Sequence, residues 1–137
     1  MRHFVSSRSA FIAQKTLYGD LKARMGIRYP LMFDDDVFIS SVNIAKLHVF
    51  AACLSDLTIH AVAHALDHDA LDDADRRAVA LECYRAGLAD NAGQFVEDFK
   101  MSEAGSAFVE RLERTDWRRG AKRSENCLAS PRALVRW

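Results

Sequence analysis

The sequence predicts an all-α, single-domain helical bundle, and three observations support this prediction. Half of the 137 residues are hydrophobic and 28% are charged, which is typical of one globular domain with its own core. Only two prolines and six glycines interrupt the chain, so long helices are favoured over short strands. Apolar residues also recur three and four positions apart, which is the spacing of one helix face. We expect three long helices and a shorter fourth in residues 1–117, followed by a basic C-terminal tail in residues 118–137.

The first expected helix begins at a serine cap within residues 6–9 and ends at about Met25, before a glycine. Its apolar members include Phe11 and several larger aliphatic residues. Residues 27–36 are expected to form a connector, because a residue that precedes proline avoids helical angles. The three aspartates at 34–36 resemble a metal cluster, but we interpret them as caps. Carboxylates at a helix start accept hydrogen bonds from free amides and complement the helix dipole.

The second helix is expected to run from the Ser40–Asn43 region to about Leu66 and to be the central one. An apolar stripe at helical spacing follows its length: Ile44, Leu47, Phe50, Leu54, Leu57, Ala61 and Ala65. Further apolar residues cover most of the opposite side: Ala52, Ile59, Val62 and Leu66. A helix that is apolar on two sides is packed by neighbours on both.

The third helix is predicted to start at a cap provided by Asp72 or Asp73 and to continue to about Lys100, despite two glycines in this stretch. A shorter fourth helix opens at Ser102. Three long helices and a short one indicate an antiparallel bundle or a related orthogonal arrangement.

A narrow polar arc on the second helix is the candidate metal site. Its four predicted ligands are Cys53, Asp56, His60 and His64. Two neutral imidazoles four residues apart can bind one transition metal, and a carboxylate or thiolate can complete a tetrahedral zinc site. His68 continues the spacing at the end of the helix. The alternatives are a polar strip with structural histidines and a pH-sensitive contact.

Several enzyme classes are disfavoured by the local patterns. The zinc-protease motif requires Glu after the first histidine, and Ala61 follows His60 here. No Glu precedes a histidine by three residues, which disfavours a bundle di-iron site. Neither a nucleophile elbow nor a glycine-rich phosphate loop is present, although Cys53 could pair with an imidazole. We therefore expect a non-enzymatic protein without a cofactor, with a transition metal such as zinc as the alternative.

The charges are segregated along a chain whose net charge is zero. Residues 1–32 hold six basic and one acidic side chain, a balance of +5. Residues 33–115 hold seven basic and sixteen acidic side chains, a balance of −9. Residues 116–137 hold six basic and two acidic side chains, a balance of +4. Such regions can steer a charged partner, fold back on one another or pair across a homodimer.

The basic tail is predicted to contact a partner. Its candidate residues are Arg118, Arg119, Lys122, Arg123, Arg132 and Arg136. Together with Trp117 and Trp137 they mix cations and aromatic rings, as a nucleic-acid contact does. The sequence pI of about 7.0 is, however, below the range typical of nucleic-acid binders. A protein partner is therefore the main expectation and nucleic acid the alternative.

Cysteine usage and hydropathy predict the compartment. The three cysteines include no Cys-x-x-Cys pair, so we expect reduced thiols in the cytoplasm. The most apolar stretch, residues 42–66, is interrupted by charged residues and histidines, so no membrane partner is expected. The sequence thus predicts a small helical adaptor, regulator or inhibitor that docks on another macromolecule through charge-segregated surfaces. The alternatives are a metal-binding bundle, as sensor or enzyme, and a nucleic-acid-associated protein.

Overall fold

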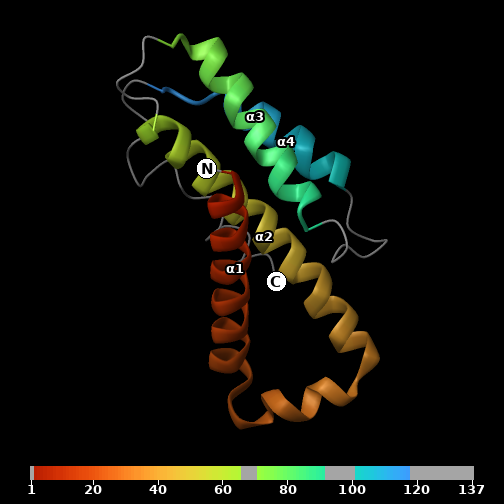
Figure 1. The fold of residues 1–137 in the computed structure, drawn as a ribbon. Coiled ribbons are helices and arrows are strands. Elements are labelled where there is room, and N and C mark those ends of the chain that lie inside the picture. Colours follow the sequence, from red (N-terminus) through yellow and green to blue (C-terminus); the bar gives the residue numbers. More distant parts are fainter. Residues whose placement is uncertain (1, 66–70, 92–100, 118–137) are drawn as a thin grey trace.

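The computed structural model describes residues 2–65, 71–91 and 101–117, and within these ranges it is helical without strands (Figure 1). The elements in chain order are α1 (Arg2–Met25), the 3₁₀ helix η1 (Gly26–Asp34), α2 (Asp36–Ala65), α3 (Asp73–Ala89) and α4 (Met101–Glu113). The prediction of an all-α fold is confirmed.

The helices are arranged around α2. Helices α1 and α2 form an antiparallel hairpin that η1 closes at one end, whereas α3 and α4 lie along the other half of α2 (Figure 1). Helix α2 contacts α1, α3 and α4, which agrees with the prediction of a central helix packed on two sides. The N-terminal end of α1 consequently lies near the C-terminal half of α2.

The start of α1 and the connector differ from the sequence prediction. Helix α1 begins at Arg2, and Ser9 lies inside it, where its hydroxyl donates to the carbonyl of Val5 at 2.7 Å. Ser7 and Ser9 therefore bond back along the helix instead of capping it. Gly26, with a φ of 57°, ends α1 as expected. The connector folds as the 3₁₀ helix η1, which includes Pro30.

Aspartate caps fix the starts of α2 and α3. Asp35 Oδ1 accepts hydrogen bonds from the amides of Val37 at 2.9 Å and Phe38 at 3.4 Å. This confirms the capping interpretation of the aspartate cluster and starts α2 earlier than the predicted Ser40–Asn43 region. Asp72 caps α3 in the same way, because its side chain accepts from the amide of Asp75 at 2.8 Å.

The prediction that the third helix continues to about Lys100 is wrong, because α3 ends at Ala89. Asn91 follows in a turn, where its amide N–H donates to the carbonyl of Leu88 at 3.1 Å. Its side-chain Nδ2 donates to the carbonyl of Gly87 at 3.0 Å and to Ser6 Oγ of α1 at 2.8 Å. These bonds satisfy carbonyls at the helix end, and residues 92–100 lie outside the described ranges.

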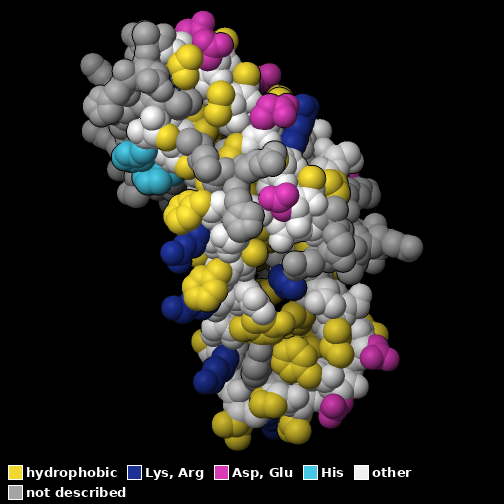
Figure 2. Space-filling view, viewed as in Figure 1, with side chains coloured by type: hydrophobic (Ala, Val, Ile, Leu, Met, Phe, Trp, Pro, Cys, Tyr) yellow, Lys and Arg dark blue, Asp and Glu magenta, His cyan; other side chains and the backbone are white. Residues whose placement is uncertain are grey.

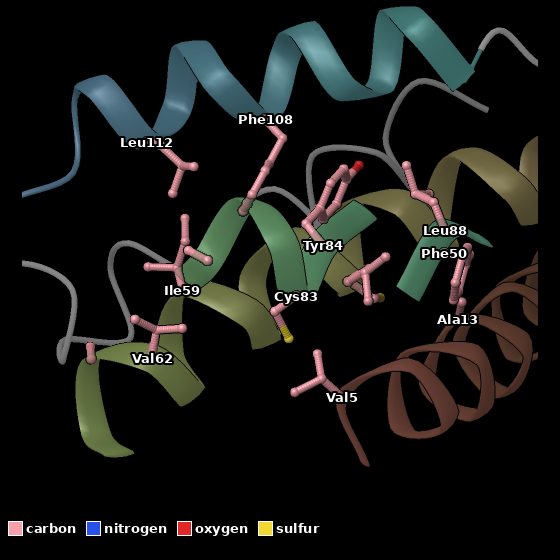
Figure 3. Close-up of a cluster of buried hydrophobic side chains, with 14 of the residues drawn as sticks. Val5, Ala13, Phe50, Ile59, Val62, Cys83, Tyr84, Leu88, Phe108 and Leu112 are labelled. Atoms are coloured by element: carbon pink, nitrogen blue, oxygen red, sulfur yellow. The ribbon is translucent and has the colours of Figure 1, made fainter. Parts of the chain in front are cut away.

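The main core joins all four helices (Figure 3). Tyr84 of α3 stacks on Phe108 of α4, with ring centroids 4.0 Å apart and an interplanar angle of 16°. Helices α2 and α3 approach closely at Gly87, where a Cβ atom would lie only 2.7 Å from Cδ1 of Leu54. The absence of a side chain at Gly87 therefore allows the two helices to pack this closely around Leu54.

Helix α2 is long and apolar enough to cross a membrane by length and composition, since it has 30 residues and an 18-residue window of mean hydropathy 1.7. The core helix of a folded domain has the same properties, and α2 packs against three other helices here. The expectation that the chain has no membrane partner stays a prediction.

Candidate functional site

The structure divides the predicted metal arc into a buried half and an exposed half. Cys53 and Asp56 are 3% and 6% exposed, whereas His60 and His64 are exposed. In residues 2–65, 71–91 and 101–117, no group of three or more His, Cys, Asp and Glu side chains is placed to hold a metal ion. His68 lies outside these ranges. Of the four predicted ligands, only the two histidines therefore lie together on the exposed surface.

The two histidine rings are neighbours on the surface of α2. Their centroids are 4.2 Å apart and the rings are tilted by 58°. Partial desolvation, and to a smaller extent the charge of His64, lower the pKa of His60 from its ordinary value. The ring of His60 is therefore neutral at pH 7 and available as a hydrogen-bond acceptor or metal ligand.

Asp56 instead forms a buried ion pair with α4. Its Oδ1 lies 2.6 Å from Nη2 of Arg111, and Nη1 of Arg111 donates to Ser55 Oγ at 2.6 Å. The side chains of Asp56 and Arg111 are 8% and 22% exposed. A buried carboxylate requires a counter-ion, so this contact fixes where α4 sits on α2. The sequence did not predict the role of Arg111 as the counter-ion of Asp56, although it is a charged residue next to Leu112, which is buried.

The predicted tail contacts, from Arg118 to Arg136, lie outside the described residues. Trp117, the last described residue, is only 2% exposed and belongs to the main core. Its indole therefore cannot serve as a stacking surface for bases.

The outward side of α1 carries a surface of aromatic and basic side chains. This α1 outer face consists of Phe4, Arg8, Phe11, Lys15 and Lys22. Phe4 and Phe11 are 60% and 59% exposed, and Cζ of Arg8 lies 5.5 Å from the ring centroid of Phe4. Figure 2 shows hydrophobic and basic side chains alternating along this edge, with histidine side chains at its upper end.

Helical spacing could have revealed this face. Its members are separated by three, four and seven positions, so they share one side of α1. The acid of α1, Asp20, pairs with Arg24 at 2.8 Å. The core-facing side instead carries small residues such as Ser9 and Ala13, which are 0% and 1% exposed. Phe11, which the sequence grouped with the apolar members of the first helix, is therefore exposed in the structure.

Two further surfaces are exposed or hollowed. At the hairpin end, Ile27, Leu31 and Val37 are 97%, 71% and 74% exposed. Between α3 and α4, a groove of about 620 Å³ is lined by residues that include Leu88 and Val109. The hairpin-end surface is apolar, whereas the groove also contains charged residues, among them Arg85, Glu110 and Glu113.

Comparison of the chain with known protein families, curated proteins and solved structures finds no match.

Proposed function

We propose that this chain is a non-enzymatic interaction protein that docks on an acidic protein surface through the α1 outer face. One observation carries the proposal. Phe4 and Phe11 stand about 60% exposed among three cations on a helix whose other side is packed into the core. Aromatic residues and arginine are enriched at protein interfaces, and arginine is also enriched among their energetic hot spots.

The magnitude of the available apolar energy supports a docking role. A phenylalanine that is 60% exposed presents roughly 120 Å² of surface, so Phe4 and Phe11 together present roughly 240 Å². At about 25 cal/mol per Å², complete burial of this area contributes up to about 6 kcal/mol before the costs of association. Because association itself costs a comparable amount, the two rings act as anchors to which the neighbouring cations add favourable electrostatics.

The cations define the complementary surface. Arg8, Lys15 and Lys22 are exposed, and Phe4 and Phe11 lie between and beside them. An acidic partner is steered to such a face and held in register, while a basic one is repelled. The zero net charge of the chain favours a protein over a polyanion, because nucleic-acid binders usually carry a strong positive balance.

The test is a photo-cross-linking amino acid placed at position 11 of the full chain in cells. We expect a discrete protein adduct that disappears when Arg8, Lys15 and Lys22 are all changed to Glu. The matched control reverses exposed cations elsewhere, with Arg85→Glu and Arg114→Glu, and should leave the adduct intact. Circular dichroism shows whether each variant stays folded. An adduct that survives reversal of the α1 cations contradicts the proposal.

Two further experiments distinguish docking through α1 from binding through the basic tail and from binding to nucleic acid. A chain ending at Trp117 keeps the adduct if the α1 outer face is sufficient, and loses it if the basic tail carries the interaction. Nucleic-acid binding is measured by the anisotropy of a labelled single-stranded RNA at several salt concentrations. If the three α1 cations contact phosphates, log affinity falls with log salt at a slope of about −2. A protein adduct without such binding supports the acidic protein partner.

A further inference from the structure

The exposed ends of His60 and His64 form a second candidate site that is independent of the docking proposal. Both residues lie near the C-terminal end of α2, four positions apart, so their side chains leave the helix on the same side. Their ring centroids are 4.2 Å apart. We propose that His60 and His64 together bind one borderline divalent cation, such as Cu²⁺, Ni²⁺ or Zn²⁺, with water completing its coordination.

The ring separation suits a shared ion. Imidazole nitrogens bind these metals at about 2.0–2.1 Å, so two nitrogens on one ion are roughly 3 Å apart. Rings whose centroids are 4.2 Å apart can bring one nitrogen each to that separation by side-chain rotation alone. The tilt of 58° keeps the rings from stacking face to face, which leaves their edges accessible.

Protonation of the histidine rings opposes metal binding. A metal binds the neutral imidazole, so protonation of either ring competes with the ion.

The surroundings determine the metal preference. The Asp56 carboxylate is engaged by Arg111 at 2.6 Å, and the Cys53 side chain is buried in the core. Among the described residues, the site therefore offers imidazole nitrogens without a free thiolate or carboxylate beside them. Affinity should follow the order Cu²⁺, Ni²⁺ and then Zn²⁺, and Mg²⁺, which requires oxygen ligands, should not bind.

The test is isothermal titration of the untagged full chain with each metal chloride in a buffer without chelators. All titrations use the His3→Ala chain as background, so that the N-terminal histidine does not contribute. We expect one ion per chain, with Kd raised at least about tenfold by His60→Ala and by His64→Ala. His48→Ala removes another exposed histidine of α2 and should leave Kd unchanged, as should Cys53→Ala.

A second readout locates the ion. Substoichiometric Ni²⁺ should broaden amide resonances around positions 60 and 64 in a ¹H–¹⁵N spectrum before any others. Absence of heat with Cu²⁺ and Ni²⁺, or binding that survives His64→Ala, overturns the proposal. So does an equal loss of affinity in Cys53→Ala or in His68→Ala, because the ion would then have a different ligand set.

Discussion

The ion pair between Asp56 and Arg111 allows a sharp test of how α4 is held on α2. Replacement of Arg111 by Met keeps the length and apolar stem of the side chain but removes its charge. The Asp56 carboxylate, 8% exposed, would then be buried without its counter-ion, and Ser55 would lose the donor that lies 2.6 Å from its hydroxyl. The variant should therefore be strongly destabilised.

The magnitude follows from the burial of the two side chains. Removal of one partner from a buried ion pair typically costs about 3–5 kcal/mol. Because Arg111 is 22% exposed, water already solvates part of the site, and the lower end of about 3 kcal/mol is expected. At roughly 2 cal/mol/K of unfolding entropy per residue, the Tm of a 137-residue chain falls by about 3–4 °C per kcal/mol. Arg111→Met should thus lower the Tm by about 10 °C.

The assay is urea unfolding followed by circular dichroism, with thermal melts as a second measure. Arg114→Met is the matched control, since Arg114 is 76% exposed and pairs with Glu110 on the surface of α4. Loss of the ion pair between Arg114 and Glu110 should change the free energy of unfolding by less than about 1 kcal/mol. The double variant Arg111→Met with Asp56→Leu removes both charges and should recover to within about 1 kcal/mol of the parent chain.

Two outcomes would refute this reasoning. If Arg111→Met is as stable as Arg114→Met, Asp56 is not held by its counter-ion. If the double variant is less stable than Arg111→Met alone, the cost comes from lost packing and not from an uncompensated carboxylate.

Three further predictions concern Gly87, Gly19 and Tyr84. Gly87→Ala should lower the free energy of unfolding by about 1–2 kcal/mol, because the clash of its Cβ with Leu54 outweighs the gain in helix propensity. Gly19→Ala, with nothing within 4 Å of its Cβ, should instead raise it by about 0.5–1 kcal/mol in the same urea unfolding assay. Burial raises the pKa of Tyr84, so the folded state keeps this proton above about pH 10, and stability is lost as pH rises beyond that value. Tyr84→Phe should remove about 1.4 kcal/mol of the loss in the free energy of unfolding that is measured between about pH 8 and pH 11.

The sequence predicted those parts of the fold that depend on interactions between residues close together in the chain. Aspartates before apolar runs predicted caps, and Asp35 and Asp72 make them. The two-sided apolar pattern of residues 44–66 predicted a central helix, because its period is that of a helix. The end of α3 was not predictable by this reasoning, since apolar spacing continues beyond it and the terminating bonds involve Ser6, a residue 85 positions away from Asn91.

The candidate site was predictable only in part for the same reason. Spacing along one helix correctly placed His60 beside His64, because residues four apart share a face. The spacing could not show that Asp56 turns to α4, since a contact with Arg111 depends on tertiary packing. The ion pair with Arg111 of α4 therefore separates Asp56 from the two histidines of the predicted metal site.

The location of the α1 outer face follows from how α1 meets the core. Ser9 and Ala13, both almost fully buried, allow α1 to pack closely, so its bulky Phe4 and Phe11 are left outside. Exposed phenyl rings contribute little to the free energy of unfolding, because most of their surface stays in water in both states. Substitutions on this face should therefore leave the fold intact. A loss of partner binding in such variants can consequently be assigned to the surface itself, which separates docking from folding in this chain.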